Sequence, residues 1–222
     1  MTTYPSLPPS GLYALTPDGD SDTSHLVARV LGALRGGAAL VQYRDKHNNP
    51  AQRRTRALAL VAACQPWGVP LIVNDEVNLA VEVGAAGVHL GRDDGDPSVA
   101  RAQLGASRII GVSCYDSLAL AREAVAAGAD YIAFGSFYAS ATKPAAVRCP
   151  LEVLRRASQE LMVPIVAIGG ITAENALPLV VAGASLLAVV GALFDCPDTA
   201  TAARAFAAPL SRLASHTHRK SP

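Results

Sequence analysis

Four times along the chain, a glycine stands at the end of a helix-like stretch and a short apolar run follows it. The four segments are GAALVQYR from Gly37, GAAGVHLG from Gly84, GADYIAFG from Gly128 and GASLLAVVG from Gly183. A glycine just past a helix supplies the left-handed residue that ends it, and a short apolar run between turns is typical of a buried strand. The repeat predicts strands and helices that alternate around a parallel sheet, with functional residues past the carboxyl ends of the strands.

The number of such units points to a closed barrel. We expect eight strands with helices between them, which favours a (β/α)8 TIM barrel of the α/β class over an open doubly wound sheet, although closure itself is not visible in a sequence. The predicted strands cover residues 12–15, 40–43, 71–73, 88–90, 109–112, 131–134, 165–168 and 186–190. The predicted helices cover residues 24–35, 51–64, 79–83, 97–104, 118–127, 151–161, 173–181 and 199–213.

Length and composition fit one domain with a large core. The chain has 222 residues, of which 50% are hydrophobic and 17% charged, as expected for strands that are buried on both faces. We expect a disordered segment at residues 1–10, a single catalytic domain at residues 11–213 and a flexible tail at residues 214–222.

The charge balance disfavours polyanionic partners. The net charge is +1 and no dense run of Lys and Arg occurs, so neither nucleic acid nor a membrane surface is an expected partner. Small-molecule substrates are expected instead. The polar, proline-rich start of the chain does not resemble a secretory signal, which predicts a cytoplasmic protein. The oligomeric state stays open, a homo-oligomer included.

The cysteines and histidines carry little chemistry in this interpretation. Cys64, Cys114, Cys149 and Cys196 are widely spaced without a CxxC pair, so we expect buried small side chains rather than a zinc site or disulfides. His89 alternates with apolar neighbours in a predicted strand. It is therefore expected to be a hydrogen-bonded barrel residue rather than a catalyst.

A cationic cluster follows the second predicted strand. Gln42, Arg44 and Lys46 alternate there, so in an extended chain they point to one side. An amide and two cations can hold a phosphate or pyrophosphate, because Arg offers a two-pronged donor and Lys a mobile charge. The alternative, a solvated strand end, stays open at this stage.

Carboxylates follow the third and fourth predicted strands. Asp75 and Asp94 stand at those strand ends, which converge at a barrel mouth. Mg²⁺ takes oxygen ligands and leaves positions for substrate phosphate, so these two residues are the candidate metal ligands. Two structural alternatives remain: Asp75 could cap the helix that follows it, and residues 93–96 could form an ordinary acidic turn.

Groups that can donate hydrogen bonds to a phosphate follow the later strands. Ser113 comes after the fifth strand, and the loop at 135–143 places hydroxyls beside Lys143. Gly169 and Gly170 follow the seventh strand, and Gly191 follows the eighth. Glycines at these ends let backbone N–H groups approach an anion, as in the usual phosphate site of such barrels.

Taken together, these motifs resemble those of the thiamine-phosphate synthase family. The resemblance covers nearly all of the chain from Gly11 to Asp195, and its elements keep the family's order. They are VQYRDK at 41–46, VNDEVNLA at 73–80, GVHLGRDD at 87–94, GVS at 111–113, the loop that ends in Ala141, Thr142 and Lys143, and AIGGIT at 167–172.

The resemblance implies a (β/α)8 enzyme that joins a pyrimidine diphosphate to a thiazole phosphate and releases pyrophosphate. It implies a dissociative reaction, with Mg²⁺ bound by Asp75 and Asp94 and with Lys143, Ser113 and Arg44 as catalytic residues. The implied pyrimidine diphosphate site comprises Gln42, Tyr43, Arg44, Asp45, Lys46, Asn74, Ser113 and Lys143. The implied thiazole phosphate site comprises Ser140, Ala141, Thr142, Gly169, Gly170, Val190 and Gly191.

Four positions depart from the family pattern. Arg92 stands where Gln is common, Tyr115 where His is common, Ser140 for Thr and Gly191 for Ser. Two alternatives to the synthase are therefore kept. A thiazole tautomerase would need a proton-transferring group in the mouth, such as the absent His at position 115. A ligand-binding barrel without catalysis is the other alternative, because Arg92 and Gly191 alter the expected site.

Overall fold

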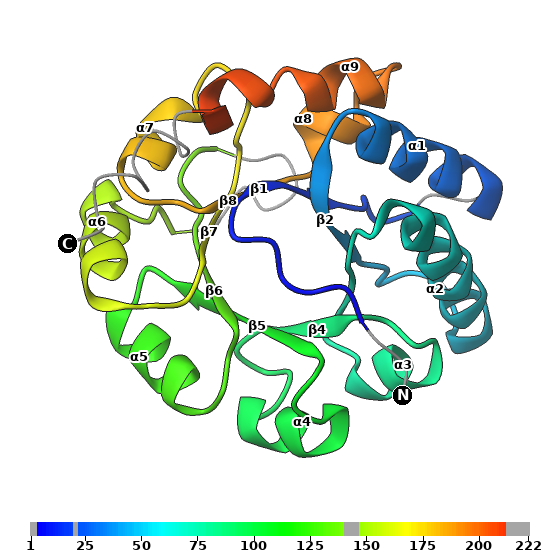
Figure 1. Cartoon of the computed structure of the whole chain (residues 1–222), viewed down its shortest axis with the longest axis horizontal. Coiled ribbons are helices and arrows are strands. Elements are labelled where there is room, and N and C mark those ends of the chain that lie inside the picture. Colours follow the sequence, from blue (N-terminus) through cyan, green and yellow to red (C-terminus); the bar gives the residue numbers. More distant parts are fainter. Residues whose placement is uncertain (1–3, 20–21, 140–146, 212–222) are drawn as a thin grey trace.

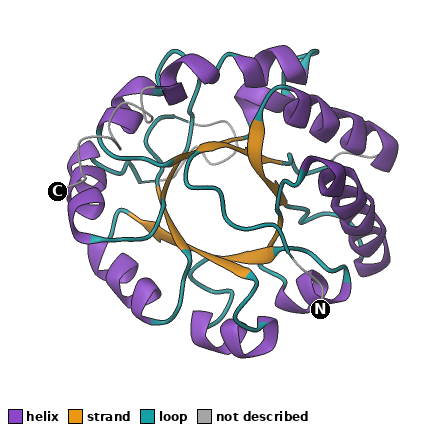
Figure 2. Ribbon diagram, in the orientation of Figure 1, coloured by secondary structure: helices purple, strands orange, loops and turns teal. Residues whose placement is uncertain are grey.

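The computed structural model describes residues 4–19, 22–139 and 147–211. Eight parallel strands pair in sequence order and close on themselves, because β1 pairs with both β2 and β8. Figure 1 shows the helices as a ring outside these strands, and Figure 2 shows the same two layers by element type. The predicted closed TIM barrel is confirmed.

The strands match their predicted positions closely. They are β1 Gly11–Leu15, β2 Ala38–Tyr43, β3 Leu71–Asn74, β4 Gly87–Leu90, β5 Ile109–Tyr115, β6 Tyr131–Phe134, β7 Ile165–Ile168 and β8 Leu186–Val189. The helices are α1 Thr23–Arg35, α2 Pro50–Cys64, α3 Val77–Glu82, α4 Pro97–Leu104, α5 Leu118–Ala126, α6 Leu151–Glu160, α7 Leu177–Val181, α8 Gly191–Phe194 and α9 Thr199–Arg204. A short 3-10 helix, η1 Gln65–Trp67, follows α2.

Two helices differ from their predicted extents. The helix expected from residue 173 begins only at Leu177, since residues 173–175 form turns and Pro178 lies in the first turn of α7. The helix expected from residue 199 breaks at 205–206 and resumes at 207–211. The four-residue α8 was not predicted as a separate element, because so short a helix leaves no periodic pattern.

The four glycines that follow helices end those helices, as the sequence predicts. Gly37, Gly84, Gly128 and Gly183 have φ angles of 98°, 68°, 95° and 109°. Each donates its N–H to a carbonyl three residues back in the preceding helix, at 3.0–3.3 Å. The left-handed conformation ends the helix and turns the chain into the next strand.

Alternation along the strands divides the core in two. Outward side chains such as Val41 and Val88 pack against the helices. Inward ones form a second cluster inside the barrel, which includes Tyr13, Leu40 and Tyr131. The strand alternation thus decides which polar residues face the interior and reach the mouth.

The N-terminal segment covers the floor of the barrel. Residues 1–10 were predicted to be disordered. Residues 1–3 lie outside the described residues, but Tyr4 and Leu7 pack against the inner cluster, and Figure 1 shows the segment that begins at Tyr4 crossing the view of the barrel. Arg108 donates to the Tyr4 hydroxyl and lies 4.6 Å from the centre of its ring. The contact of Tyr4 with Arg108 and the packing of Tyr4 and Leu7 on the apolar floor explain why this segment has a defined position. Composition alone does not indicate it. The tail at 214–222 lies outside the described residues.

This packing predicts a stability effect at Tyr4. Tyr4→Ala removes the ring from Arg108 and from the inner cluster, so we expect a loss of about 1–2 kcal/mol and a Tm lower by roughly 2–8 °C. Leu58→Ala, on the exposed side of α2, is the control and should leave Tm nearly unchanged. Thermal unfolding measures both, and an unchanged Tm for Tyr4→Ala would show that the segment does not stabilise the barrel.

Candidate active site

A cavity of about 600 Å³ opens at the carboxyl ends of the strands. It draws lining residues from all eight strands or from the loops that follow them. Predicted site residues in its wall are Gln42, Arg44, Asn74, Ser113, Gly169, Gly170, Val190 and Gly191. The structure thus brings together residues that are spread over most of the sequence, as expected for a barrel mouth.

The loop after β1 positions the cationic cluster. The Thr16 hydroxyl accepts the Arg44 N–H at 2.9 Å and donates to the Arg44 carbonyl at 3.2 Å. Asp18 pairs with the Arg44 guanidinium and accepts the Lys46 N–H at 3.1 Å. Burial lowers the pKa of Arg44, while the charge of Asp75 acts in the opposite direction. Thr16 and Asp18 were not predicted as site residues, because the sequence does not show that the loop after β1 adjoins the end of β2.

Two residues of the implied pyrimidine diphosphate site face away from the cavity. Tyr43 is 2% exposed and donates its hydroxyl proton to Asp45 at 2.9 Å. Asp45 also accepts from Asn48 and from Arg56 of α2. Burial would raise the pKa of Asp45, but the hydrogen bonds from Asn48, Tyr43 and His47 outweigh it and lower the pKa. These two residues therefore join β2 to its following loop and helix.

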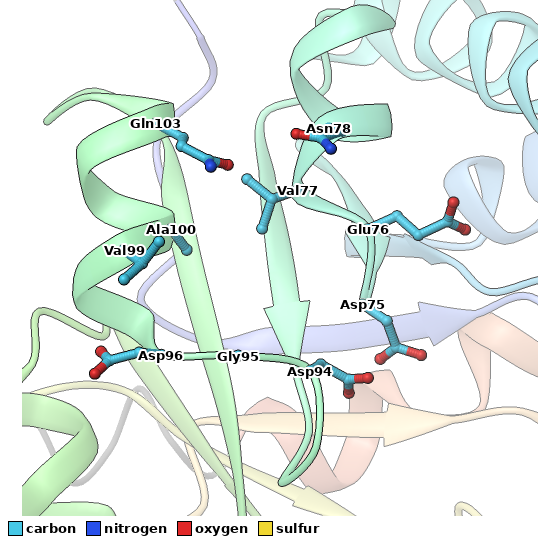
Figure 3. A pocket seen from close by; sticks show the side chains of 10 residues that line it. All are labelled: Asp75, Glu76, Val77, Asn78, Asp94, Gly95, Asp96, Val99, Ala100 and Gln103. Carbon is cyan, nitrogen blue, oxygen red and sulfur yellow. The ribbon is translucent and has the colours of Figure 1, made fainter.

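Asp75 and Asp94 lie together beside a second cavity of about 360 Å³ between α3 and α4. Figure 3 shows their carboxyl groups next to each other, with Asp96 pointing away. Burial and then hydrogen bonding with the Asp94 carboxyl raise the pKa of Asp75, and Lys46 partly offsets this with its Nζ at 3.2 Å from Oδ2. The Asp94 Oδ2 also accepts the Gly91 N–H at 2.8 Å.

The backbone argues against a purely structural role for Asp75. The N-cap of α3 is Glu76, without a side-chain cap, so Asp75 does not cap that helix. Its φ of 65° is in the left-handed region, which is uncommon for residues other than glycine and found often at functional sites. The acidic-turn alternative is met at residues 92–94, which form a turn and a bend, while Asp96 caps α4 by accepting the Ser98 N–H at 2.7 Å.

Within the described part of the chain, no three His, Cys, Asp or Glu side chains gather as a metal site. A two-carboxylate arrangement still fits Mg²⁺, which is commonly held by one or two carboxylates with water and substrate phosphate as the other ligands. Asp75 and Asp94 therefore remain the residues that suit this cation.

Close packing requires glycine at the two positions after β7, independently of any role in binding an anion. A Cβ on Gly169 would lie 2.0 Å from the Ser136 Oγ, and one on Gly170 would lie 2.1 Å from the Ala139 carbonyl oxygen. Both glycines have positive φ. The loop after β6 is thus pressed against the loop after β7, and the backbone of both borders the cavity.

Several wall residues were not identified as site residues from the sequence. Asp195 lies in the wall, and a Cβ on Gly191 would be 2.7 Å from its Oδ2, so this carboxylate occupies space near the position where serine is common. Cys196 also lies in the wall and is exposed, which contradicts the prediction that all four cysteines are buried. Cys64, Cys114 and Cys149 are buried as predicted, and burial raises the pKa of each to about 12.

The two departures Arg92 and Tyr115 form a pair. The Arg92 guanidinium lies 4.6 Å from the centre of the Tyr115 ring, and the Arg92 N–H donates to the Tyr115 hydroxyl at 3.3 Å. Tyr115 borders the main cavity and has a φ of 57°. The extra cation is therefore held over an aromatic ring at the rim, a favourable contact.

Ser140, Ala141, Thr142 and Lys143 fall in the segment 140–146, outside the described residues. Their predicted roles stay predictions. The chain enters that segment after Ala139, which borders the main cavity, and leaves it before Val147.

Fold and site define a class: a (β/α)8 barrel whose mouth gathers cations, carboxylates and glycine-rich turns, as in enzymes that act on phosphorylated substrates. The family described as thiamine monophosphate synthase matches residues 12–193, and the chain belongs to this family. None of the helices within the described ranges is long and apolar enough to span a bilayer.

Individual relatives agree with this assignment. A thiamine-phosphate synthase of Thiobacillus denitrificans is 57% identical, with 92% of this chain and 95% of the relative covered. That of Aromatoleum aromaticum is 54% identical, with 88% and 94% covered. The solved thiamine phosphate pyrophosphorylase from Pyrococcus furiosus superposes with a TM-score of 0.82 at 32% identity, covering 91% of this chain and 96% of the other. Thiamine-phosphate synthesis is therefore the function of the chain.

The carboxylate pair predicts an inverse effect on stability. The pKa of Asp75 is raised in the folded state, so the folded chain binds the proton more tightly than the unfolded one and the ionised form opposes folding at neutral pH. Asp75→Asn should raise Tm by roughly 1–3 °C at pH 7 without divalent cations, since the partly exposed contact with Lys46 contributes little. Asp93→Asn, at an exposed neighbour, is the control. A lower Tm for Asp75→Asn would contradict the proximity of the two carboxylates.

Proposed function

We propose that this cavity joins 4-amino-2-methyl-5-hydroxymethylpyrimidine diphosphate to 4-methyl-5-(2-phosphoethyl)thiazole, or to its carboxylated form, and that the reaction depends on Mg²⁺. The products are thiamine monophosphate and pyrophosphate. The observation that carries the proposal is the meeting of Arg44 and Lys46 with Asp75 at one rim, where Lys46 contacts Asp75 directly. Cationic and anionic side chains meet at this rim. A diphosphate together with a divalent cation complements them better than a diphosphate alone or a cation alone.

Asp75 and Asp94 would hold the cation. After burial, the neighbouring Asp94 carboxyl is the next cause of the raised pKa of Asp75, so a positive ion between the two side chains would favour the ionised form of Asp75. When bound, Mg²⁺ would supply positive charge beside a departing pyrophosphate.

Arg44, Asn74 and Ser113 would bind the diphosphate from the cavity wall, with Lys46 at the rim and Lys143 as a further predicted donor. In the proposed reaction the bond from the pyrimidine CH₂ to oxygen breaks, and its electron pair leaves with pyrophosphate. The thiazole nitrogen then gives its lone pair to that carbon. Fixed donors around the departing oxygens stabilise their growing charge, and the attacking nitrogen needs no general base.

The thiazole phosphate would bind on the opposite side of the mouth. Gly169 and Gly170 after β7, and Val190 and Gly191 after β8, border the cavity there. Backbone at these strand ends is the usual phosphate position of such barrels, and Ser140, Ala141 and Thr142 are the further predicted ligands. The two substrates would face each other across the cavity.

A direct assay tests the reaction and its cofactor. Purified protein with both substrates should form thiamine monophosphate and pyrophosphate in the presence of Mg²⁺. Chelation of the cation should abolish turnover, and its return should restore it. No product above background with Mg²⁺ would reject the synthase. Conversion of the thiazole phosphate alone to an isomer would favour the tautomerase alternative.

Neighbouring aspartates provide a matched pair for the cation site. Asp94→Asn should lower kcat by at least about 100-fold, because it removes a proposed Mg²⁺ ligand beside the leaving group. Asp93→Asn carries the same chemical change at the adjacent, exposed position and should retain nearly full activity. Steady-state kinetics at several Mg²⁺ concentrations measures both. Equal losses in the two variants would remove Asp94 from the proposed role.

A further inference from the structure

A chain of hydrogen bonds crosses the barrel interior below the mouth. The Gln42 Nε2 donates to the Tyr13 hydroxyl at 2.7 Å, and that hydroxyl lies 2.8 Å from the Tyr131 hydroxyl. The Tyr131 hydroxyl lies 2.9 Å from the His89 Nδ1, and the His89 Nε2 lies 2.9 Å from the Ser113 Oγ. The two ends of this chain, Gln42 and Ser113, both belong to the implied pyrimidine diphosphate site.

Close packing fixes the aromatic groups of this chain. Tyr13 and Tyr131 are 1% and 0% exposed, and their rings meet edge to face at 6.0 Å. The His89 ring stacks on Tyr131 at 5.6 Å. A Cβ on Gly111 would lie 1.9 Å from the Tyr131 ring, so only glycine leaves room for the ring at that inward position. These contacts leave the two phenol rings and the imidazole little room to move.

The chemistry of the groups sets the direction of these bonds. An amide nitrogen only donates, so the Tyr13 oxygen accepts from Gln42. Burial raises the pKa of both phenols above the ordinary value, so each keeps its single proton at neutral pH. If Tyr131 donated to Tyr13, the Tyr13 proton would have no acceptor among the described partners of that hydroxyl, Gln42 Nε2 and Tyr131, which is costly in a buried site. Tyr13 therefore donates to Tyr131.

The same direction continues through the histidine. Tyr131 has accepted from Tyr13, so its own proton goes to the His89 Nδ1, and this nitrogen must be unprotonated. A neutral imidazole then carries its proton on Nε2, and this N–H donates to the Ser113 Oγ. The Ser113 hydroxyl proton is left to point elsewhere, and Ser113 lies in the wall of the main cavity.

We propose that His89 is a positioning residue: held in the Nε2–H tautomer by Tyr13 and Tyr131, it makes Ser113 a hydrogen-bond donor to anionic oxygens in the cavity. Without this arrangement the serine could equally turn its proton back toward the histidine. The idea rests on the proposed function for the identity of the anion, a diphosphate, but the tautomer is inferred from the hydrogen bonds of Tyr13 and Tyr131 and does not depend on that identity.

The tautomer is measured directly by NMR. Protein labelled with ¹⁵N-histidine gives long-range ¹H–¹⁵N correlations that distinguish the two neutral tautomers and the imidazolium, and His89→Gln assigns the signal. At neutral pH without substrate we expect the Nε2–H form in the unaltered protein and a change in its population in Tyr131→Phe. A predominant Nδ1–H form or imidazolium in the unaltered protein would overturn the proposal, whether or not Tyr131→Phe folds.

Anion binding tests the consequence. With inorganic pyrophosphate and Mg²⁺ as the probe, Ser113→Ala and Tyr131→Phe should each weaken binding roughly tenfold in calorimetry. The double variant should be no weaker than Ser113→Ala, because both act through one donor. Tyr4→Phe deletes a phenol hydroxyl at the barrel floor and should bind normally. Additive losses would overturn the proposal. Failure of the unaltered protein to bind pyrophosphate would instead reject the proposed function and leave the tautomer result standing.

Discussion

Closure of the parallel barrel is the constraint on which the site depends. The pairing of β1 with β8 joins residues 11–14 to residues 186–189, and only this contact brings the loop after β1 beside the glycine turn after β8. Because all strands run in the same direction, every carboxyl end meets the same rim. Alternation then divides each strand, so that Gln42 and His89 face inward while Tyr43 packs outward. The strand topology and the alternation of side chains together determine which residues reach the substrate cavity.

The charges at the rim are balanced in a way that favours exchange. Arg44 is paired with Asp18, and Lys46 with Asp75, so neither cation lacks a partner before substrate arrives. Partly exposed ion pairs stabilise a fold little, and replacing them by contacts with a diphosphate costs correspondingly little. The pairing of Asp75 with Asp94 is different, because both carry the same charge. The protein accepts this unfavourable contact where a divalent cation would turn it into a binding site, a common compromise between stability and function.

Much of this could be predicted from the sequence, and the failures have physical causes. The positions of the strands follow from short apolar runs. The alternation of side chains along a strand predicts that Gln42 and Arg44 lie on the same side, and glycines mark the ends of helices. Thr16 and Asp18 could not be found, because their importance arises from a contact across 28 residues. The burial of Tyr43 and Asp45 away from the cavity could not be predicted for a related reason. A sequence motif gives the order of neighbouring residues but does not say which face of the strand each side chain takes. The order of Tyr4 depends on Arg108, far along the sequence.

The most direct test of the central claim is a crystal structure of the protein with pyrophosphate and Mg²⁺. We expect a cation coordinated by carboxylate oxygens of both Asp75 and Asp94, with pyrophosphate oxygens completing its ligands. The anion should also contact the Arg44 guanidinium and the Ser113 hydroxyl. A cation bound away from these two carboxylates, or pyrophosphate seated outside the mouth of the barrel, would contradict it.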